Sequence, residues 1–263
     1  MASLRAKALL IDLDNTLVPE LANYSAAFAG TCRDLARERA IELTKLRDAV
    51  FGAALDRWLA SPVADWCARI GIGSPTSLLS DFPGDAPELA FLRGWAPDYR
   101  RASWTDGLRA AGLRDADALA IPLSDDFRQR IREHCPAYAD APAAVETLAR
   151  TYTLGIATNG PADVQRIKLT VSGLRRFFPV VVASSDVGAG KPDPRIFAAA
   201  VERLRVSPED VLVVGDSLAK DVAGAHAAGL RCVWVDRTGA ERDQACVPDA
   251  EVRSLAELPA LLA

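Results

Sequence analysis

Short apolar runs alternate with segments of helical spacing along the second half of the chain. Four runs are short and largely apolar, at residues 153–157, 180–183, 211–214 and 231–235. Four segments show helical spacing, at residues 161–172, 193–204, 218–228 and 255–262. Continuous rather than alternating apolar runs are typical of strands that are covered on both faces. The alternation therefore predicts an α/β fold, with a parallel sheet and helices on both sides.

The first half of the chain has a different character. Residues 8–11 form one more apolar run, but the residues that follow show helical patterning and no convincing strand. We expect helices at residues 21–39, 43–59, 87–93, 99–111 and 127–133, with loops at 71–75 and 82–85. The predicted organisation is an α/β core, residues 1–18 and 137–263, which an all-α insertion, residues 19–136, interrupts after the first strand.

Composition places the 263-residue chain among ordinary globular proteins. Half of the residues are hydrophobic and 25% are charged, which excludes a disordered chain. The net charge of −4 gives no general attraction to nucleic acids or anionic membranes, so we expect neither as a partner. No apolar run approaches the ~18 residues that a membrane helix needs.

Cysteine usage and the amino terminus indicate a cytoplasmic protein. The five cysteines are odd in number and form no Cys-x-x-Cys pair, as expected for thiols in a reducing compartment. The apolar run at residues 8–11 is interrupted by Asp12 and Asp14, too early for a secretory signal.

Acidic residues follow two of the predicted strands. Asp12 and Asp14 come directly after the first strand, and Gly215 and Asp216 follow the run at 211–214. Asp221 stands near the start of the next helix. If the two strands are neighbours, these carboxylates converge at the edge of the sheet where ligands bind, and a Mg²⁺ ion would relieve their repulsion. The alternative is that each aspartate only caps a helix.

A lysine and a threonine stand in two further loops that follow predicted strands. Lys191 lies between a glycine and a proline just before a helix, where it could offset carboxylate or phosphate charge. Thr158 offers a hydroxyl at the end of another strand, and the N–H groups at the start of the next helix favour an anion. A solvated lysine and an ordinary helix cap are the alternatives.

Single residues exclude several other motifs. An EF-hand calcium loop starting at Asp12 would need a glycine where Leu17 stands. Lys191 is followed by proline rather than serine or threonine, which excludes a Walker A phosphate loop. With only two histidines, His134 and His226, nothing favours histidine-based zinc hydrolysis or Ser-His-Asp catalysis.

Taken together in chain order, these segments resemble the four motifs of the haloacid dehalogenase-like (HAD) hydrolase superfamily. The motifs are residues 12–16, residues 158–160, residues 191–194, and Gly215 and Asp216 with Asp221. The resemblance covers residues 1–18 and 137–263 and implies a Rossmann-like core. The insertion resembles a C1-type helical cap, which in that family closes over the site and selects the substrate.

The resemblance implies covalent catalysis in which two aspartates have different tasks. Asp12 would be the nucleophile, which attacks phosphorus and forms an aspartyl-phosphate. Asp14 would be the general acid for the leaving oxygen and then the base for the hydrolytic water. The backbone carbonyl of Asp14 would also bind Mg²⁺.

The same resemblance assigns the remaining motif residues to the metal and the phosphoryl group. Asp216 and the nucleophile would be side-chain ligands of Mg²⁺, and Asp221 would support the ion through water or by pairing with Lys191. Thr158 and Asn159 would hold phosphoryl oxygens. Lys191 would neutralise the charge that develops during phosphoryl transfer.

The acid at position 14 discriminates within the family. True haloacid dehalogenases lack an acid there, because a halide leaving group needs no proton, and phosphonate hydrolases replace it. Asp14 therefore favours phosphate monoesters, and we expect a Mg²⁺-dependent phosphatase of a small phosphorylated metabolite, such as a sugar phosphate or nucleotide. A phosphomutase or other HAD-type phosphotransferase, and a catalytically inactive HAD-like binding module, are the alternatives.

The insertion shows no motif that ties it to a substrate. Arg100 and Arg101 could bind an anion but are expected on a solvated face. Four tryptophans are expected to pack in a core rather than to stack on a ligand: Trp58, Trp66, Trp95 and Trp104.

Overall fold

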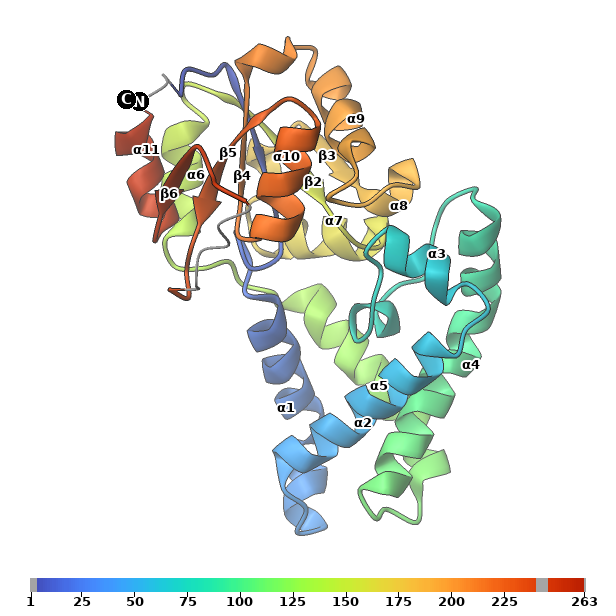
Figure 1. Ribbon diagram of the computed structural model, residues 1–263. Helices are drawn as coiled ribbons and strands as arrows, with labels where there is room; N and C mark the ends of the chain where they lie inside the picture. The colour runs from blue at the N-terminus through green and yellow to red at the C-terminus, as the bar shows by residue number, and fades with distance from the viewer. Residues whose placement is uncertain (1–3, 240–245, 263) are drawn as a thin grey trace. The chain divides into compact units, whose positions relative to one another are not determined.

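The computed structural model describes residues 4–239 and 246–262 of the chain. The chain divides into two compact units (Figure 1). One unit is formed by Met1–Pro19 and Pro136–Ala263 and holds the sheet. The other is formed by Glu20–Cys135 and is built of helices.

An all-parallel sheet of six strands lies at the centre of the first unit, as far as the chain is described. The strand order is β3-β2-β1-β4-β5-β6, so β1 and β4 are neighbours. The strands are β1 Ala8–Ile11, β2 Thr153–Thr158, β3 Val180–Ala183, β4 Val211–Gly215, β5 Arg231–Val235 and β6 Ala250–Val252. The predicted α/β fold is confirmed. The apolar pattern missed β6, which is short and only partly buried.

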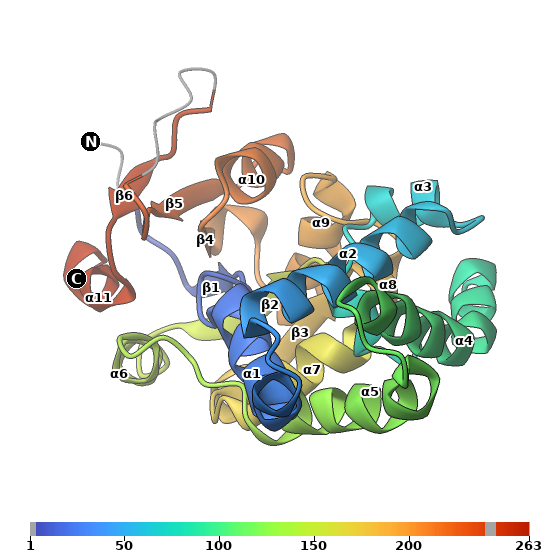
Figure 2. The same cartoon turned by 90° about the horizontal axis from the view of Figure 1, so that it is seen from below.

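Helices cover both faces of this sheet. They are α6 Ala141–Leu148, α7 Ala162–Val171, α8 Ser184–Val187, α9 Pro194–Leu204, α10 Ala223–Ala227 and α11 Leu258–Leu261. On one face, Ile196 and Phe197 of α9 share a buried cluster with Leu10 of β1. The view in Figure 2 places α6, α7 and α11 on the opposite face. The sheet is therefore buried on both sides, which is why its strands read as continuous apolar runs.

Two of the predicted helices begin irregularly. The segment predicted at 218–228 starts with a π-helical turn, Leu218–Val222, before α10. The main-chain N–H groups of Asp221 and Val222 both donate to Ser217 O, at 2.8 and 3.2 Å. The segment predicted at 255–262 starts with a 3₁₀ turn, Leu255–Glu257, before α11. Wide turns of the first kind are frequent at functional sites.

The chain leaves the first unit and returns to it at adjoining points. The N–H groups of Leu17 and Val18 donate to Leu13 O, at 2.9 Å each. The N–H group of Tyr138 donates to Leu17 O, also at 2.9 Å. The two ends of the helical insertion are thus hydrogen-bonded within the unit that holds the sheet.

The second unit differs from expectation in its longest helices. It consists of α1 Glu20–Glu38, α2 Leu43–Leu59, α3 Ala64–Arg69, α4 Pro87–Ala110 and α5 Ala116–Glu133, with a 3₁₀ turn at Thr76–Leu78. The break predicted between residues 93 and 99 is wrong, because α4 continues through Pro97. The start predicted at residue 127 is also wrong, because α5 begins before Pro122. A proline inside a helix costs about 3 kcal/mol, which the burial of side chains such as Leu92 and Tyr99 offsets.

Aromatic side chains form much of the core of the helical unit. Phe28 stacks on Trp104 with ring centroids 5.5 Å apart, and Trp95 stacks on Tyr99 with centroids 4.6 Å apart. Trp104 is fully buried, Trp58 nearly so, and Trp66 and Trp95 pack against the same cluster as Trp58. The tryptophans therefore contribute to packing, as expected.

Arg100 and Arg101, the two arginines of the helical unit considered as anion ligands, have different environments. Arg101 is half exposed and pairs with Asp98 on the surface, as expected. For Arg100 the prediction of a solvated face is wrong, because only 12% of its side chain is exposed. Arg100 donates to Ser80 O at 2.8 Å and lies 3.6 Å from the carboxylate of Asp81. Its guanidinium group thus holds the loop before α4.

The cysteines show no disulfide among the described residues. All five are free thiols: Cys32, Cys67, Cys135, Cys232 and Cys246. Across the part of the chain that the structure describes, no helix is both long enough and apolar enough to cross a membrane.

Gly107 marks a close approach between α4 and α2. A Cβ added there would lie 2.4 Å from Val50 Cα. We expect Gly107→Ala to lower the free energy of unfolding by about 1–3 kcal/mol, because backbone atoms cannot move aside easily. Gly94 lies on the same helix with nothing within 4 Å, so Gly94→Ala should raise that free energy by about 0.5–1 kcal/mol. Urea unfolding compares both variants with the wild type, and a stabilising Gly107→Ala would contradict the close approach.

Candidate active site at the carboxyl edge of the sheet

Asp12 and Asp14 lie where β1 ends. The N–H group of Asp12 donates to Val214 O at 2.9 Å, which continues the pairing of β1 with β4 by one residue. The chain then turns at Asn15, which has a φ of 63° and donates its N–H to Val18 O at 2.7 Å. Asparagine tolerates this left-handed conformation better than most residues. The turn therefore fixes both aspartates at the edge of the sheet.

The neighbouring strand β4 brings two more carboxylates to this edge. Asp216 follows Gly215 directly and accepts a hydrogen bond from Thr16 Oγ1 at 3.1 Å. Asp221 comes from the π-helical turn, and its Oδ2 accepts from the N–H group of Ser217 at 3.0 Å. A Cβ added at Gly215 would lie 2.2 Å from Asp221 Cγ. Glycine thus makes room for the Asp221 carboxylate over the end of β4.

Lys191 lies between two of these carboxylates. Its Nζ donates to Asp221 Oδ1 at 2.6 Å and also pairs with Asp12 Oδ1. All three side chains are nearly completely buried. Burial works against the charge of Lys191, but the carboxylates of Asp12 and Asp221 more than offset it, so the pKa of Lys191 lies above its usual value. The lysine is held in its charged form.

Burial and neighbouring negative charge raise the pKa values of two carboxyl groups of the site as well. Burial raises the pKa of Asp12 well above its usual value; the charges of Asp221 and Asp216 add to the shift, and Lys191 opposes it. Burial, together with the charge of Asp221, raises the pKa of Asp216 to about 6. Neighbouring carboxylates thus add to the effect of burial in both shifts, and the positive charge of Lys191 opposes it.

The cluster formed by the carboxylates of Asp12, Asp216 and Asp221 has the composition of a magnesium site. Oxygen atoms of Asp12, Asp216 and Asp221 all lie within 4.8 Å of one another. Three carboxylates and the ammonium of Lys191 leave two negative charges when all are ionised, which a divalent cation would neutralise. A set of oxygen ligands alone is the kind that Mg²⁺ prefers. The residues present therefore fit the ion that the sequence predicts.

Thr158 and Asn159 lie at the end of β2, but their side chains have different surroundings. Thr158 is 1% exposed, and its Oγ1 accepts from Gln165 Nε2 at 2.7 Å. The side chain of Asn159 makes two hydrogen bonds with the main chain of Lys191, at 2.9 and 2.7 Å. Asn159 thus holds the loop that carries Lys191, a contact that the sequence did not predict.

Two main-chain N–H groups near the start of α7 are already engaged within the unit. Gly160 donates to Ser184 Oγ and Ala162 donates to Ser185 Oγ, both at 2.9 Å. The expectation that the N–H groups at this helix start favour an anion is therefore wrong for these two. Both serines directly follow β3, and polar residues just after a predicted strand were a signal that could have identified them.

Sequence reasoning also missed two side chains of α7 that contact Asp14. Lys168 Nζ lies 2.8 and 2.9 Å from the two carboxylate oxygens of Asp14. Gln165 Nε2 lies 2.8 Å from Asp14 Oδ2. Both residues occupy the buried stripe of the helix together with Leu169. A lysine and a glutamine in an apolar stripe were the signal in the sequence.

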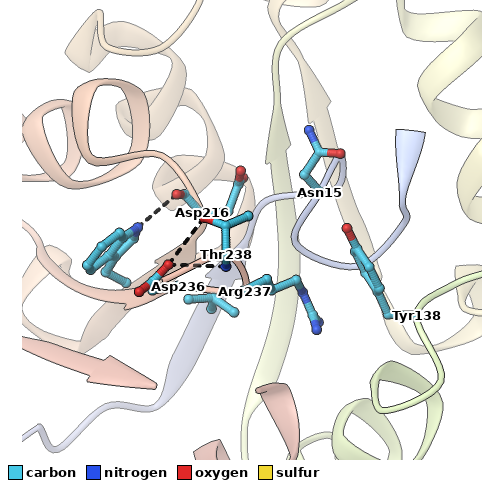
Figure 3. A pocket seen from close by; sticks show the side chains of 8 residues that line it. Asn15, Tyr138, Asp216, Asp236, Arg237 and Thr238 are labelled. Carbon is cyan, nitrogen blue, oxygen red and sulfur yellow. Dashed lines mark hydrogen bonds between the residues drawn. The ribbon is translucent and has the colours of Figure 1, made fainter. Parts of the chain in front are cut away.

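A pocket of about 240 Å³ opens beside Asp216 (Figure 3). Asn15, Tyr138 and Arg237 line it together with Asp216. The guanidinium group of Arg237 lies 3.9 Å from the centre of the Tyr138 ring and pairs with Asp140 at 3.1 Å. A water molecule takes about 30 Å³, so Asp216 borders a pocket with room for several water molecules.

This arrangement of carboxylates on a parallel sheet belongs to a known class of enzymes. Residues 6–229 match the haloacid dehalogenase-like hydrolase family. The chain belongs to this family, which confirms the resemblance seen in the motifs, and it is a HAD-like hydrolase. The helical insertion between β1 and β2 is consistent with the C1-type cap of the family.

Similar proteins include phosphatases and dehalogenases. Phosphoserine phosphatase of Thermus thermophilus is 36% identical over 253 residues, 96% of this chain and 97% of the relative. The structure of a 2-haloacid dehalogenase from Pseudomonas syringae has a TM-score of 0.63 at 28% identity and covers 98% of each chain. The HAD-hydrolase YfnB from Bacillus subtilis, solved with bound magnesium, has a TM-score of 0.62 at 24% identity, covering 98% of this chain and 99% of that one. The last similarity bears on the fold alone.

Gly215 offers a test of the carboxylate arrangement. Gly215→Ala would place a methyl group against Asp221, so the carboxylate must move away from its position over β4. We expect the affinity for Mg²⁺, measured by calorimetry, to fall by about 10-fold or more, as is typical when a group that supports a metal ligand is disturbed. Gly94→Ala, in the helical unit, is the control and should leave the affinity unchanged. Unchanged affinity in Gly215→Ala would show that Asp221 does not support the ion.

Proposed function

We propose that this HAD-like hydrolase is a Mg²⁺-dependent phosphatase, which hydrolyses a small phosphate monoester through an aspartyl-phosphate on Asp12. The observation that carries the proposal is the buried group of Asp12, Asp216 and Asp221 around Lys191. A phosphoserine phosphatase that matches nearly the whole chain supports the reaction class.

In the first half of the reaction, the phosphoryl group moves to the protein. A carboxylate oxygen of Asp12 attacks phosphorus, and the bond from phosphorus to the leaving oxygen breaks. Asp14 gives its proton to that oxygen, so the leaving group departs as an alcohol. Thr158, Asn159 and Lys191 hold the phosphoryl oxygens, and the ammonium of Lys191 opposes their charge.

In the second half, water releases the phosphate. Asp14, now a carboxylate, removes a proton from the water that attacks phosphorus, and the bond to Asp12 breaks. Inorganic phosphate leaves, and both aspartates return to their starting forms. The side chains of Asp12 and Asp216 and the backbone carbonyl of Asp14 would hold Mg²⁺, with support from Asp221. When bound, the ion would supply positive charge that lets the nucleophile approach the anionic phosphoryl group.

Asp14 favours a phosphatase over a dehalogenase, although a 2-haloacid dehalogenase shares the fold. A halide leaves as a stable anion, whereas an alkoxide needs a proton to leave. The carboxyl of Asp14 stands two residues beyond the nucleophile, where the resemblance to the family places the acid. The chain therefore carries a group that only the ester reaction requires.

The two segments of the chain have separate tasks in this proposal. Residues 1–18 and 137–263 carry out the chemistry, and the helical insertion, residues 19–136, acts as a cap that selects the substrate. The substrates are small phosphorylated metabolites of the cytoplasm. Phosphoserine is the first compound to test because of the similarity to a phosphoserine phosphatase, followed by sugar phosphates, phosphoglycolate and nucleoside monophosphates.

The substrate panel also distinguishes the alternatives. A phosphomutase or other phosphotransferase would return the phosphoryl group to a sugar and require a sugar bisphosphate, so release of free phosphate from simple esters would count against it. A protein with no activity on any ester in the presence of Mg²⁺ would be a binding module, and the proposal would be wrong.

Removal of the metal tests the carboxylate group directly. We expect EDTA to abolish phosphatase activity and Mg²⁺ to restore it, because three buried carboxylates repel a phosphate ester unless a cation neutralises them. Calcium should substitute poorly, since its larger and looser coordination shell misplaces the nucleophile. Phosphate release is measured before and after metal stripping. Full activity of the stripped protein would contradict the mechanism.

Separate substitutions of Asp12 and Asp14 test their different tasks. Asp12→Asn should lose all turnover and form no phospho-enzyme, because the covalent bond cannot form. In kcat/KM, which covers only the steps up to departure of the leaving group, Asp14→Asn should lose about 10²–10⁴-fold with an alkyl phosphate but much less with p-nitrophenyl phosphate, whose leaving group needs no proton. Steady-state rates with both esters and acid-quench detection of phospho-Asp12 check these outcomes. Equal losses with both esters would show that Asp14 is not the acid.

A further inference from the structure

Helix α7 carries a charged and a polar side chain on its buried side. Gln165 and Lys168 lie about one helical turn apart, and both are 0% exposed. A fully buried lysine is rare, because an ammonium group without water is unfavourable unless an anion compensates it. The ammonium of Lys168 is therefore expected to pair with an anionic side chain inside the sheet unit.

That partner is the carboxyl group of Asp14. Lys168 Nζ donates to Asp14 Oδ1 at 2.8 Å and to Oδ2 at 2.9 Å, so the ammonium bridges both oxygens. Gln165 Nε2 adds a third contact, at 2.8 Å to Oδ2. Contacts with both oxygens restrict rotation of the carboxyl group as well as its position. The side chain of Asp14 keeps 17% of its surface exposed, which leaves it accessible to a substrate.

The same amide nitrogen also reaches the end of β2. Gln165 Nε2 lies 2.7 Å from Thr158 Oγ1 and 3.0 Å from Asn159 O. A carbonyl oxygen can only accept a hydrogen bond, so the amide presents its NH₂ group to these atoms. One side chain therefore contacts both Asp14, the proposed acid, and Thr158, which is proposed to hold a phosphoryl oxygen.

We propose that Lys168 is a positioning residue for Asp14, and that Gln165 links the position of Asp14 to that of Thr158. This inference rests on the proposed phosphatase mechanism. Lys168 keeps its protons throughout: the proton that reaches the leaving oxygen comes from Asp14, and the proton of the attacking water returns to Asp14. The task of Lys168 is to hold the carboxyl within the ~2.6–3.2 Å that proton transfer requires.

Substitution of Lys168 distinguishes a structural role from a positioning role. Loss of a structural lysine would slow hydrolysis of alkyl phosphates and of p-nitrophenyl phosphate alike, whereas loss of a positioning lysine would slow mainly the hydrolysis of alkyl phosphates. Lys168→Met keeps the length of the side chain and removes the charge. We expect kcat with the best alkyl phosphate of the panel to fall about 10- to 100-fold, as for a misplaced catalytic group, with little change in KM. With p-nitrophenyl phosphate kcat/KM, which covers only the steps up to departure of the leaving group, should stay near the wild-type value, because that leaving group needs no proton from Asp14.

Arg166→Met is the matched control on the same helix. Arg166 pairs with Asp186 on the exposed side of α7, so its loss should leave both rates unchanged. The rates of Lys168→Met are compared with those of Arg166→Met. This comparison separates loss of the Asp14 contact from a general disturbance of α7.

A double variant tests whether Lys168 acts through Asp14. In the Asp14→Asn background, adding Lys168→Met should cause no further loss of kcat with the alkyl phosphate, because the group that Lys168 positions is already gone. The double variant has neither charge of the pair, so this comparison remains available if Lys168→Met alone leaves a carboxylate uncompensated and fails to fold. Thermal unfolding of each variant confirms that the proteins compared are folded.

The outcomes separate this inference from the proposed function. Equal losses of kcat/KM with both esters in Lys168→Met, or a further loss in the double variant, would overturn the positioning role while leaving the phosphatase proposal intact. A wild-type protein that releases phosphate from no ester in the presence of Mg²⁺ would overturn the proposed function itself. A selective loss with the alkyl phosphate, absent from Arg166→Met, supports the proposal.

Discussion

The buried ammonium of Lys191 is the interaction on which the site depends. Asp12 and Asp221 are both deeply buried, and their negative charges would repel each other strongly without a cation between them. Lys191 supplies one positive charge, and the main chain of its loop is held by Asn159. One positive charge does not balance the three carboxylates of Asp12, Asp216 and Asp221, so a divalent cation would still be attracted to them. The ammonium of Lys191 thus stabilises the buried aspartates, and the negative charge that it leaves unbalanced would attract a cation.

The parallel sheet makes this proximity possible. In the register of β1 with β4, Ile11 lies beside Val214, so the residues that follow each strand meet at one edge. Three segments far apart in the sequence then need only short loops to bring their side chains together. The glycine that ends β4 lets the next turn fold back over the strand, and the wide π-helical turn places Asp221 there. Backbone geometry thus determines which carboxylates converge.

The sequence predicted those elements and site residues that depend on a local pattern of side chains. Continuous apolar runs identified the five longest strands, and the acids directly after β1 and β4 identified the carboxylate group. The three-residue strand β6 lies below what an apolar pattern can reveal, and the helices that continue through Pro97 and Pro122 depend on packing that outweighs propensity. The contact of Lys168 with Asp14 joins residues 154 positions apart. No local pattern encodes such a pair, although a lysine in an apolar helical stripe indicates that some partner exists.

The hydrogen bond between Tyr138 and Leu17 has a consequence for how such enzymes diversify. It joins the two segments of the sheet unit at the point where more than a hundred residues are inserted. The entropic cost of closing a loop grows slowly with its length. An insertion of different length therefore changes the stability of the sheet unit little. Substitutions, and even whole exchanges, in the helical segment can therefore accumulate while the backbone pairing of the sheet unit stays unchanged. The hydrogen bond between Leu17 and Tyr138 thus marks the point at which one helical segment can be replaced by another, in evolution or in engineering.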